Sequence, residues 1–211
     1  MLSQLVRKHS KIILEPIARF ISWTGFSPNF ITVIGFLLTV GVAIVLASGY
    51  FQIGGILIII AAAFDALDGT LARMIGRTSK FGAFLDSTLD RFSEAVIFFG
   101  ILVHLSFLQP YMFETQIQLL LIYATMVGSL MVSYTRARAE GIGISPKDGI
   151  LTRFERVTLL IIGLVLYPLT NKMSLAVVLC IMAIFTNVTA VQRMLIVRKL
   201  TRSDKESQTE T

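Results

Sequence analysis

DALDGTLARMIGRTSKFGAFLDSTLD, residues 65–90, is the stretch that decides the fold. It lies between two strongly apolar runs, IGGILIIIAAAF before it and AVIFFGILVHL after it. A carboxylate inside a membrane-spanning helix costs about 2.5–3.5 kcal/mol on insertion scales and usually marks a functional site. The stretch carries four of them: Asp65, Asp68, Asp86 and Asp90. We therefore expect these carboxylates to share a compensating positive charge.

The spacing of the aspartates indicates a metal site. Asp65 and Asp68 are three residues apart, and Asp86 and Asp90 are four apart, so each pair lies on one face of a helix. Two such faces can converge on hard cations through oxygen ligands. Because the stretch contains no Cys or His, Mg²⁺ or Mn²⁺ fits better than Zn²⁺. We predict one or two such ions, held by all four aspartates.

The order D-x2-D-G-x2-A-R-x8-G-x3-D-x3-D resembles the signature of the CDP-alcohol phosphatidyltransferase family. The resemblance implies a transferase that moves a phosphatidyl group from a CDP-linked lipid to an alcohol and releases CMP. It implies two metal ions on Asp65, Asp68 and Asp86, with Asp90 as the base that takes the proton of the acceptor hydroxyl. Asp90 can touch a metal as well.

The resemblance also implies where the CDP-linked lipid binds. Small residues in the motif allow a ligand to come close to the backbone, and the start of the first apolar run resembles the family segment that borders the nucleotide. The residues assigned to this site are Asp68, Gly69, Ala72, Arg73, Asn29, Thr32 and Gly82.

A second group of residues points to a phosphorylated acceptor. Several guanidinium groups near one membrane face can clamp a phosphate: Arg136, Arg153, Arg156 and Arg193. The surrounding segments resemble the subgroup of the family that makes phosphatidylinositol phosphate from inositol 1-phosphate. Glycerol 3-phosphate is the alternative acceptor, and both CDP-diacylglycerol and an ether-lipid equivalent such as an archaetidyl donor stay open.

Composition predicts an all-α membrane protein. Hydrophobic residues make up 55% of the 211 residues and charged residues 15%, against about 25% charged in soluble domains. A membrane helix needs about 20 residues, and we predict six spans in a catalytic domain over 27–200. A juxtamembrane segment, 1–26, is expected to hold an amphipathic interfacial helix, and 201–211 a disordered cytoplasmic tail. The predicted spans are 29–49, 52–75, 81–107, 115–139, 151–170 and 173–198.

Charge predicts the orientation. With six spans, every Lys and Arg except Lys172 falls on or near the side that carries both termini, and cytoplasmic loops are the positive ones. We therefore expect cytoplasmic termini, a cytoplasmic active site and a multi-pass protein of the cell membrane. The net charge of +6 fits anionic lipid and phosphorylated substrates, and we predict no nucleic-acid partner.

Two readings from other classes compete with the enzyme. A divalent-cation transporter would use the aspartates as a midplane site, but the carboxylates cluster toward one face and no second polar relay follows. A lipid-binding scaffold would keep ligand binding without turnover. The family resemblance also implies a homodimer, and Gly100 and Gly128 offer small surfaces for helix contacts.

Overall fold

The computed structural model describes residues 15–23, 25–108, 113–145 and 149–209. Every regular element in these ranges is a helix, so the predicted all-α class is confirmed. A short helix covers 15–23. It is followed by α2 (Pro28–Ala47), α3 (Phe51–Met74), α4 (Lys80–Val103), the π-helical turn η1 (His104–Leu108), α5 (Phe113–Glu140), α6 (Arg153–Val165) and α7 (Met173–Thr209).

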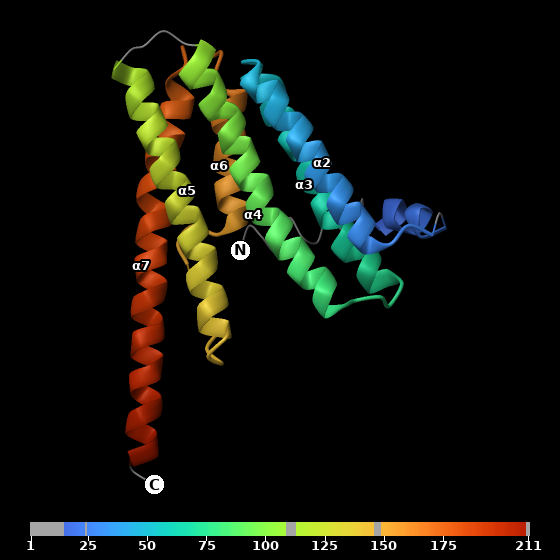
Figure 1. The fold of residues 1–211 in the computed structure, drawn as a ribbon, viewed down its shortest axis with the longest axis vertical. Coiled ribbons are helices and arrows are strands. Elements are labelled where there is room, and N and C mark those ends of the chain that lie inside the picture. Colours follow the sequence, from blue (N-terminus) through green and yellow to red (C-terminus); the bar gives the residue numbers. More distant parts are fainter. Residues whose placement is uncertain (1–14, 24, 109–112, 146–148, 210–211) are drawn as a thin grey trace.

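The helices form a bundle that runs up and down one long axis (Figure 1). Helix α2 packs against α3 and α4, α5 packs against α7, and α6 lies against both α3 and α7. The α3–α4 turn lies at the right of the view, near mid-height, whereas the α2–α3 turn and the starts of α5 and α7 lie at the upper end. The two halves of the motif, on α3 and α4, therefore lie away from the upper end of the bundle.

Caps determine where the helices around the motif begin. The Ser27 hydroxyl accepts from the Phe30 amide, with Pro28 as the first residue of α2, a position that suits proline. Ser79 caps α4 in the same way by accepting from Gly82 N at 2.9 Å. Thr152 and Glu155 form a reciprocal capping box at the start of α6. These starts fix the register of the residues that follow.

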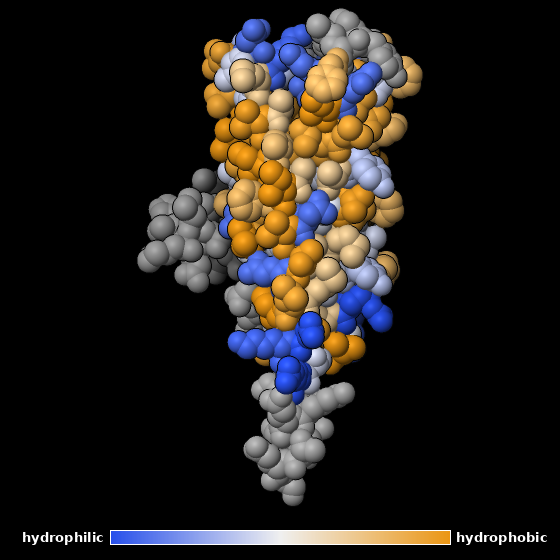
Figure 2. Space-filling model, turned by 90° about the vertical axis from the view of Figure 1, so that its left-hand side faces the viewer, coloured by the Kyte–Doolittle hydropathy of each residue, from blue (hydrophilic) through white to orange (hydrophobic). Residues whose placement is uncertain are grey.

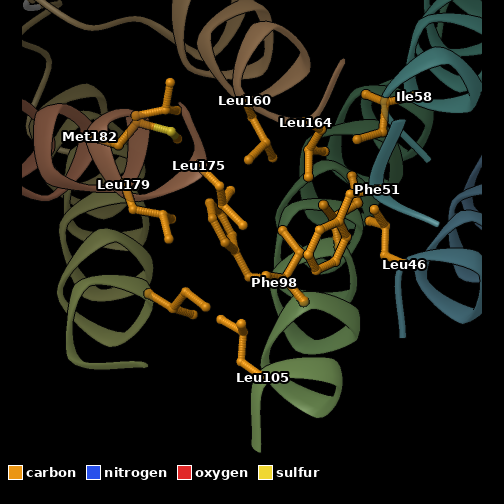
Figure 3. Packing of buried hydrophobic residues seen from close by; sticks show 14 of the residues in the cluster. Leu46, Phe51, Ile58, Phe98, Leu105, Leu160, Leu164, Leu175, Leu179 and Met182 are labelled. Carbon is orange, nitrogen blue, oxygen red and sulfur yellow. The ribbon is translucent and has the colours of Figure 1, made fainter. Parts of the chain in front are cut away.

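The apolar core fills the bundle away from the motif. Its buried residues come from all of α2 to α7, and Figure 3 shows Phe51 and Phe98 between Leu46, Leu164 and Leu175. A smaller cluster lies beside the motif and brings together Ala18, Ile31, Leu67 and Leu71. Burial of apolar surface on several helices at once holds α3 and α4 in place.

The two glycines that we expected at helix contacts serve contacts within the chain. A methyl group on Gly100 of α4 would overlap the backbone carbonyl of Ala43 on α2. One on Gly128 of α5 would overlap the Thr186 side chain on α7. Both glycines thus let two helices approach closely inside the subunit.

Four helices are long and apolar enough to cross a membrane: Pro28–Ala47, Phe51–Met74, Phe113–Glu140 and Met173–Arg202. Figure 2 shows apolar side chains over the middle of the visible face, with hydrophilic residues gathered toward its ends. The protein is therefore a membrane protein. Our six predicted spans included two more segments, which correspond to α4 and α6.

Both ends of the described chain are helical. Residues 1–14 lie outside the described part, and the helix over 15–23 buries Ala18 completely while Trp23 is 82% exposed. At the other end, α7 continues to Thr209. The predicted disordered tail, 201–211, begins within this helix, and its disorder stays a prediction.

Candidate functional site

Three of the four motif carboxylates converge between α3 and α4. Asp65 on α3 and Asp86 and Asp90 on α4 each place one oxygen within 4.8 Å of the others. The spacing of four along α4 puts Asp86 and Asp90 on one face of that helix, as expected, and this face carries both toward Asp65. Carboxylate oxygens this close form a donor set for a hard divalent cation, and the residues present therefore fit Mg²⁺ or Mn²⁺.

Asp68 lies apart from this trio. It is buried, and it accepts a hydrogen bond from the Thr32 hydroxyl of α2. Thr32 also donates to the Pro28 carbonyl at 3.1 Å, one turn earlier. Thr32 thereby connects the start of α2 to the motif, and it is one of the residues that the family resemblance assigned to the CDP-linked lipid.

A pocket of about 190 Å³ opens beside Asp68. It is formed by the start of α2, the end of α3 and the α3–α4 turn. All seven residues assigned to the CDP-linked lipid line it, and so does Asp86 of the trio: Asn29, Thr32, Asp68, Gly69, Ala72, Arg73, Gly82 and Asp86. Arg73 and Arg77 supply positive charge on its wall, which suits a diphosphate.

Gly82 keeps this pocket open at its rim. A methyl group at this position would lie 3.0 Å from Asn29 Oδ1 and 3.0 Å from Ser79 Oγ. Those contacts are tighter than ordinary van der Waals contact. A side chain at the motif glycine of α4 would therefore press on Asn29 of α2 and on the Ser79 cap.

Arg153 joins the trio from α6. Its Nη1 donates to Asp65 Oδ2 at 2.8 Å, and its Nη2 lies 2.6 Å from Asp90 Oδ1. One guanidinium therefore bridges α3 and α4 across the carboxylates. Arg91 adds a second cation, 3.1 Å from the other oxygen of Asp90.

Glu94 is a site residue that the sequence reasoning missed. It lies one turn beyond Asp90 on the same face of α4 and accepts two hydrogen bonds from Arg156, at 2.9 and 3.0 Å. Its spacing of four from Asp90 was the available signal. Because the Arg156 guanidinium is buried and holds Glu94 with two bonds, we assign it a structural role in place of the predicted contact with the acceptor phosphate.

The two remaining predicted arginines lie further from the trio. Arg193 of α7 is buried, and its Nη1 donates to the Val132 carbonyl of α5 at 2.6 Å. A methyl group on Gly149 would come within 3.1 Å of its guanidinium, so the α5–α6 connection passes beside it. Arg136 is exposed and forms an ion pair with Glu140 at 2.8 Å. The structure thus brings Arg153 to the carboxylates but not Arg136.

Residues 26–199 match the sequence model of the CDP-alcohol phosphatidyltransferase family. The chain belongs to this family. It is thus an enzyme of the phosphatidyltransferase class, and the matched range covers every site residue described above. A transporter or a scaffold does not account for this match.

Relatives of this chain within the family are named as inositol phosphate lipid synthases. The archaetidylinositol phosphate synthase of Pyrococcus horikoshii is 38% identical over 195 residues, which cover 90% of this chain and 93% of that protein. The phosphatidylinositol phosphate synthase of Corynebacterium glutamicum is 34% identical over 195 residues, covering 92% and 87%.

Solved structures of the family have the same fold as this phosphatidyltransferase. The phosphatidylinositol phosphate synthase of Mycobacterium tuberculosis with CDP-DAG bound superimposes with a TM-score of 0.81 at 30% identity, covering 88% of this chain and 93% of that one. The same enzyme in complex with manganese and citrate gives a TM-score of 0.80 at 30% identity, covering 87% and 88%.

Proposed function

We propose that this phosphatidyltransferase moves a phosphatidyl or archaetidyl group from a CDP-linked lipid to inositol 1-phosphate. The observation that carries the proposal is the pocket of about 190 Å³, which gathers all the residues assigned to the CDP-linked lipid beside the carboxylate trio. The names of the relatives support the acceptor and leave both lipid types open, because they include phosphatidylinositol and archaetidylinositol phosphate synthases.

In the proposed reaction, a hydroxyl oxygen of the acceptor attacks the β-phosphorus of the CDP-linked lipid. A new P–O bond forms, the bond from that phosphorus to the oxygen of CMP breaks, and CMP leaves. The Asp90 carboxylate takes the proton of the attacking hydroxyl. Divalent cations, when bound, would neutralise charge on the diphosphate and on the departing CMP.

The chain's own residues divide these tasks. We assign one cation to Asp65, Asp86 and Asp90, whose oxygens lie within 4.8 Å of one another, and the second ion to Asp68 and Asp86, which both line the pocket. Thr32 keeps the Asp68 carboxylate turned toward α2. Mg²⁺ and Mn²⁺ both suit these oxygens, and a manganese complex of the Mycobacterium tuberculosis relative supports the assignment.

The acceptor phosphate is assigned to Arg153, Arg193 and Arg136. Arg153 already lies at the trio, so a phosphate bound to it would place its alcohol near Asp90. Glycerol 3-phosphate also carries a phosphate and is the alternative acceptor. Serine carries none and would not need these cations.

We propose that α4 and α6 complete a six-span bundle with the four apolar helices, with both termini and the active site cytoplasmic at the cell membrane. The charged residues of α4 and α6 support this arrangement, because Glu94 and Arg156 pair with each other inside the bundle rather than facing lipid. The helix over 15–23 fits an interfacial position, with Phe20 and Trp23 exposed. The catalytic domain is then 27–200.

We also propose a homodimer, as the family resemblance implies. Large apolar side chains remain exposed on α3, α5 and α7, and they face either lipid or a second copy. The mass of the protein in detergent, measured by light scattering with the detergent subtracted, would give two chains per particle.

A transfer assay tests the function. Purified protein in detergent receives Mg²⁺ and CDP-diacylglycerol or the archaetidyl equivalent, and inositol 1-phosphate, glycerol 3-phosphate and serine are offered separately. CMP release is expected with inositol 1-phosphate. Asp90→Asn should abolish it, while Glu114→Gln, which removes a carboxylate at the start of α5, should leave it unchanged.

The other outcomes are informative. CMP release with glycerol 3-phosphate alone would overturn the acceptor and keep the class of reaction. Release with serine would show that the arginines do not select a phosphate. Full activity of Asp90→Asn would overturn the assignment of the base.

A further inference from the structure

Arg153 occupies the position at which the proposed metal site and the proposed phosphate site meet. Its guanidinium lies 2.8 Å from an oxygen of Asp65 and 2.6 Å from an oxygen of Asp90. These are two of the three carboxylates of the trio. The same residue is the arginine nearest to the carboxylates among those assigned to the acceptor phosphate.

The backbone of Arg153 is held by its helix, and its side chain reaches the carboxylates from a partly exposed position. Arg153 is the first residue of α6, beside the Thr152–Glu155 capping box. Arg156, one turn later, is anchored to Glu94 of α4 by two hydrogen bonds. The Arg153 side chain is 35% exposed, so its guanidinium can swing away from the carboxylates without moving the helix.

A divalent cation and this guanidinium compete for the same two carboxylates. A cation bound by the trio would take one oxygen from each of Asp65 and Asp90, which Arg153 now pairs with, and two positive groups side by side in a partly buried site repel each other. A phosphate placed between the cation and the guanidinium would turn this net repulsion into a net attraction, because an anion attracts both positive groups.

We propose that Arg153 is a tethered counter-ion that couples the binding of the divalent cation to the binding of the acceptor phosphate. Without phosphate, Arg153 balances the carboxylates and weakens metal binding. With phosphate, the guanidinium turns to the anion and the carboxylates are released to the metal. This inference rests on the proposed metal site and goes beyond it, since by linkage the metal must strengthen phosphate binding by the same factor.

Mn²⁺ binding to the purified full-length protein in detergent, without CDP-linked lipid, tests the proposal. Free Mn²⁺ is measured by electron paramagnetic resonance, with and without inorganic phosphate. In the wild type, phosphate should tighten Mn²⁺ binding about tenfold, within the range of typical coupling factors. In Arg153→Gln, binding without phosphate should be tighter than in the wild type, and phosphate should change it less than twofold.

Three further variants make the result specific. Arg153→Lys keeps the charge but cannot bridge two carboxylates as the planar guanidinium does, so both effects should be intermediate. Arg138→Gln removes an exposed cation at the end of α5 and should behave as the wild type. Asp86→Asn, which leaves the two Arg153 contacts in place, should lose Mn²⁺ binding.

The Asp86 and Arg153 variants distinguish a wrong metal site from a wrong coupling. If Mn²⁺ binding does not depend on Asp86, the proposed metal site is wrong and the coupling falls with it. If binding needs Asp86 but Arg153→Gln binds Mn²⁺ no more tightly than the wild type, or keeps the full phosphate effect, the coupling is overturned and the proposed function stands. Should Arg153→Gln not yield folded protein, wild-type behaviour of Arg153→Lys in both measurements would overturn the coupling.

Discussion

At the scale of single residues, the site is a set of charges that neutralise one another across helices. Arg153 joins Asp65 to Asp90, and Arg156 joins Glu94 to α6. Breaking a buried ion pair by removing one partner costs far more than the pair contributes, because the other charge stays buried. We therefore expect substitution of each of these residues to change stability or ligand binding.

Glu94→Gln should destabilise the protein strongly. The Arg156 side chain is 2% exposed, and an uncompensated buried charge costs about 3–5 kcal/mol. At roughly 2–4 °C per kcal/mol for a chain of this size, the melting temperature in detergent should fall by about 6–20 °C. Glu114→Gln should leave it within a degree or two, and an equal fall in both variants would contradict the structural role of the pair.

Thr32→Val should weaken the reaction without unfolding the protein. The substitution keeps the shape but removes the hydroxyl that donates to Asp68, and hydrogen bonds to charged groups contribute about 1.5–3 kcal/mol. We expect kcat/KM for the CDP-linked lipid to fall by about 10- to 100-fold. Thr39→Val is the matched control, because this buried hydroxyl donates to the Gly35 carbonyl of its own helix and not to a carboxylate of the motif.

If both threonine variants lose activity equally, the loss comes from α2 as a whole and not from the Asp68 contact. Activity of Thr32→Val equal to that of the wild type would show that Asp68 needs no partner on α2. Melting temperatures of both variants separate these effects from unfolding.

At the scale of the elements, close approach of helices decides the geometry of the site. Helix α2 lies against both α3 and α4, and it contributes Asn29 and Thr32 to the pocket. Gly100 allows the contact between α2 and α4, since a side chain there would overlap the Ala43 carbonyl.

Gly100→Ala should destabilise the protein, and Gly41→Ala should not. Overpacking a tight contact costs about 1–3 kcal/mol, and the Ala43 backbone cannot give way as a flexible side chain would. A methyl group on Gly41 meets nothing within 4 Å, so alanine there should stabilise α2 by about 0.5–1 kcal/mol. Thermal unfolding of both variants in detergent measures the difference, and a stabilised Gly100→Ala would refute the tight contact.

At the scale of the whole molecule, the bundle places all chemistry toward one end. The motif, the pocket and Arg153 lie where α3 ends and α4 and α6 begin. The opposite end carries the α2–α3 turn and the α6–α7 connection (Figure 1). If the molecule spans a membrane as proposed, these ends face different compartments.

Cysteine labelling in intact cells tests this orientation. In a Cys180→Ser background, Lys172→Cys should react with a membrane-impermeant maleimide, because Lys172 lies in the exposed α6–α7 connection. Ser203→Cys, near the end of α7, should react only after the cells are opened. The reverse pattern would invert the topology, and labelling of both in intact cells would place the ends of α7 on the same side.

The sequence by itself determined the all-α membrane class and the family, and the family resemblance assigned seven of the residues that line the pocket. Local information suffices for the membrane class and for the pairs within a helix: apolar runs of fixed length predict helices in a membrane, and carboxylates three or four residues apart share a helix face. The motif spacing therefore put Asp86 and Asp90 on one face of their helix, whereas their approach to Asp65 needed the packing. Asn29, distant in sequence, followed from the family resemblance alone.

Only the tertiary structure decided how the charges are paired. Glu94 and Arg156 are 62 positions apart, and Asp65 and Arg153 are 88 apart, so no periodicity relates them. Which carboxylate each arginine meets depends on how α6 lies in the bundle, which is a matter of packing. That packing brings Arg153 to Asp65 of α3 and Asp90 of α4, and Arg156 to Glu94 of α4.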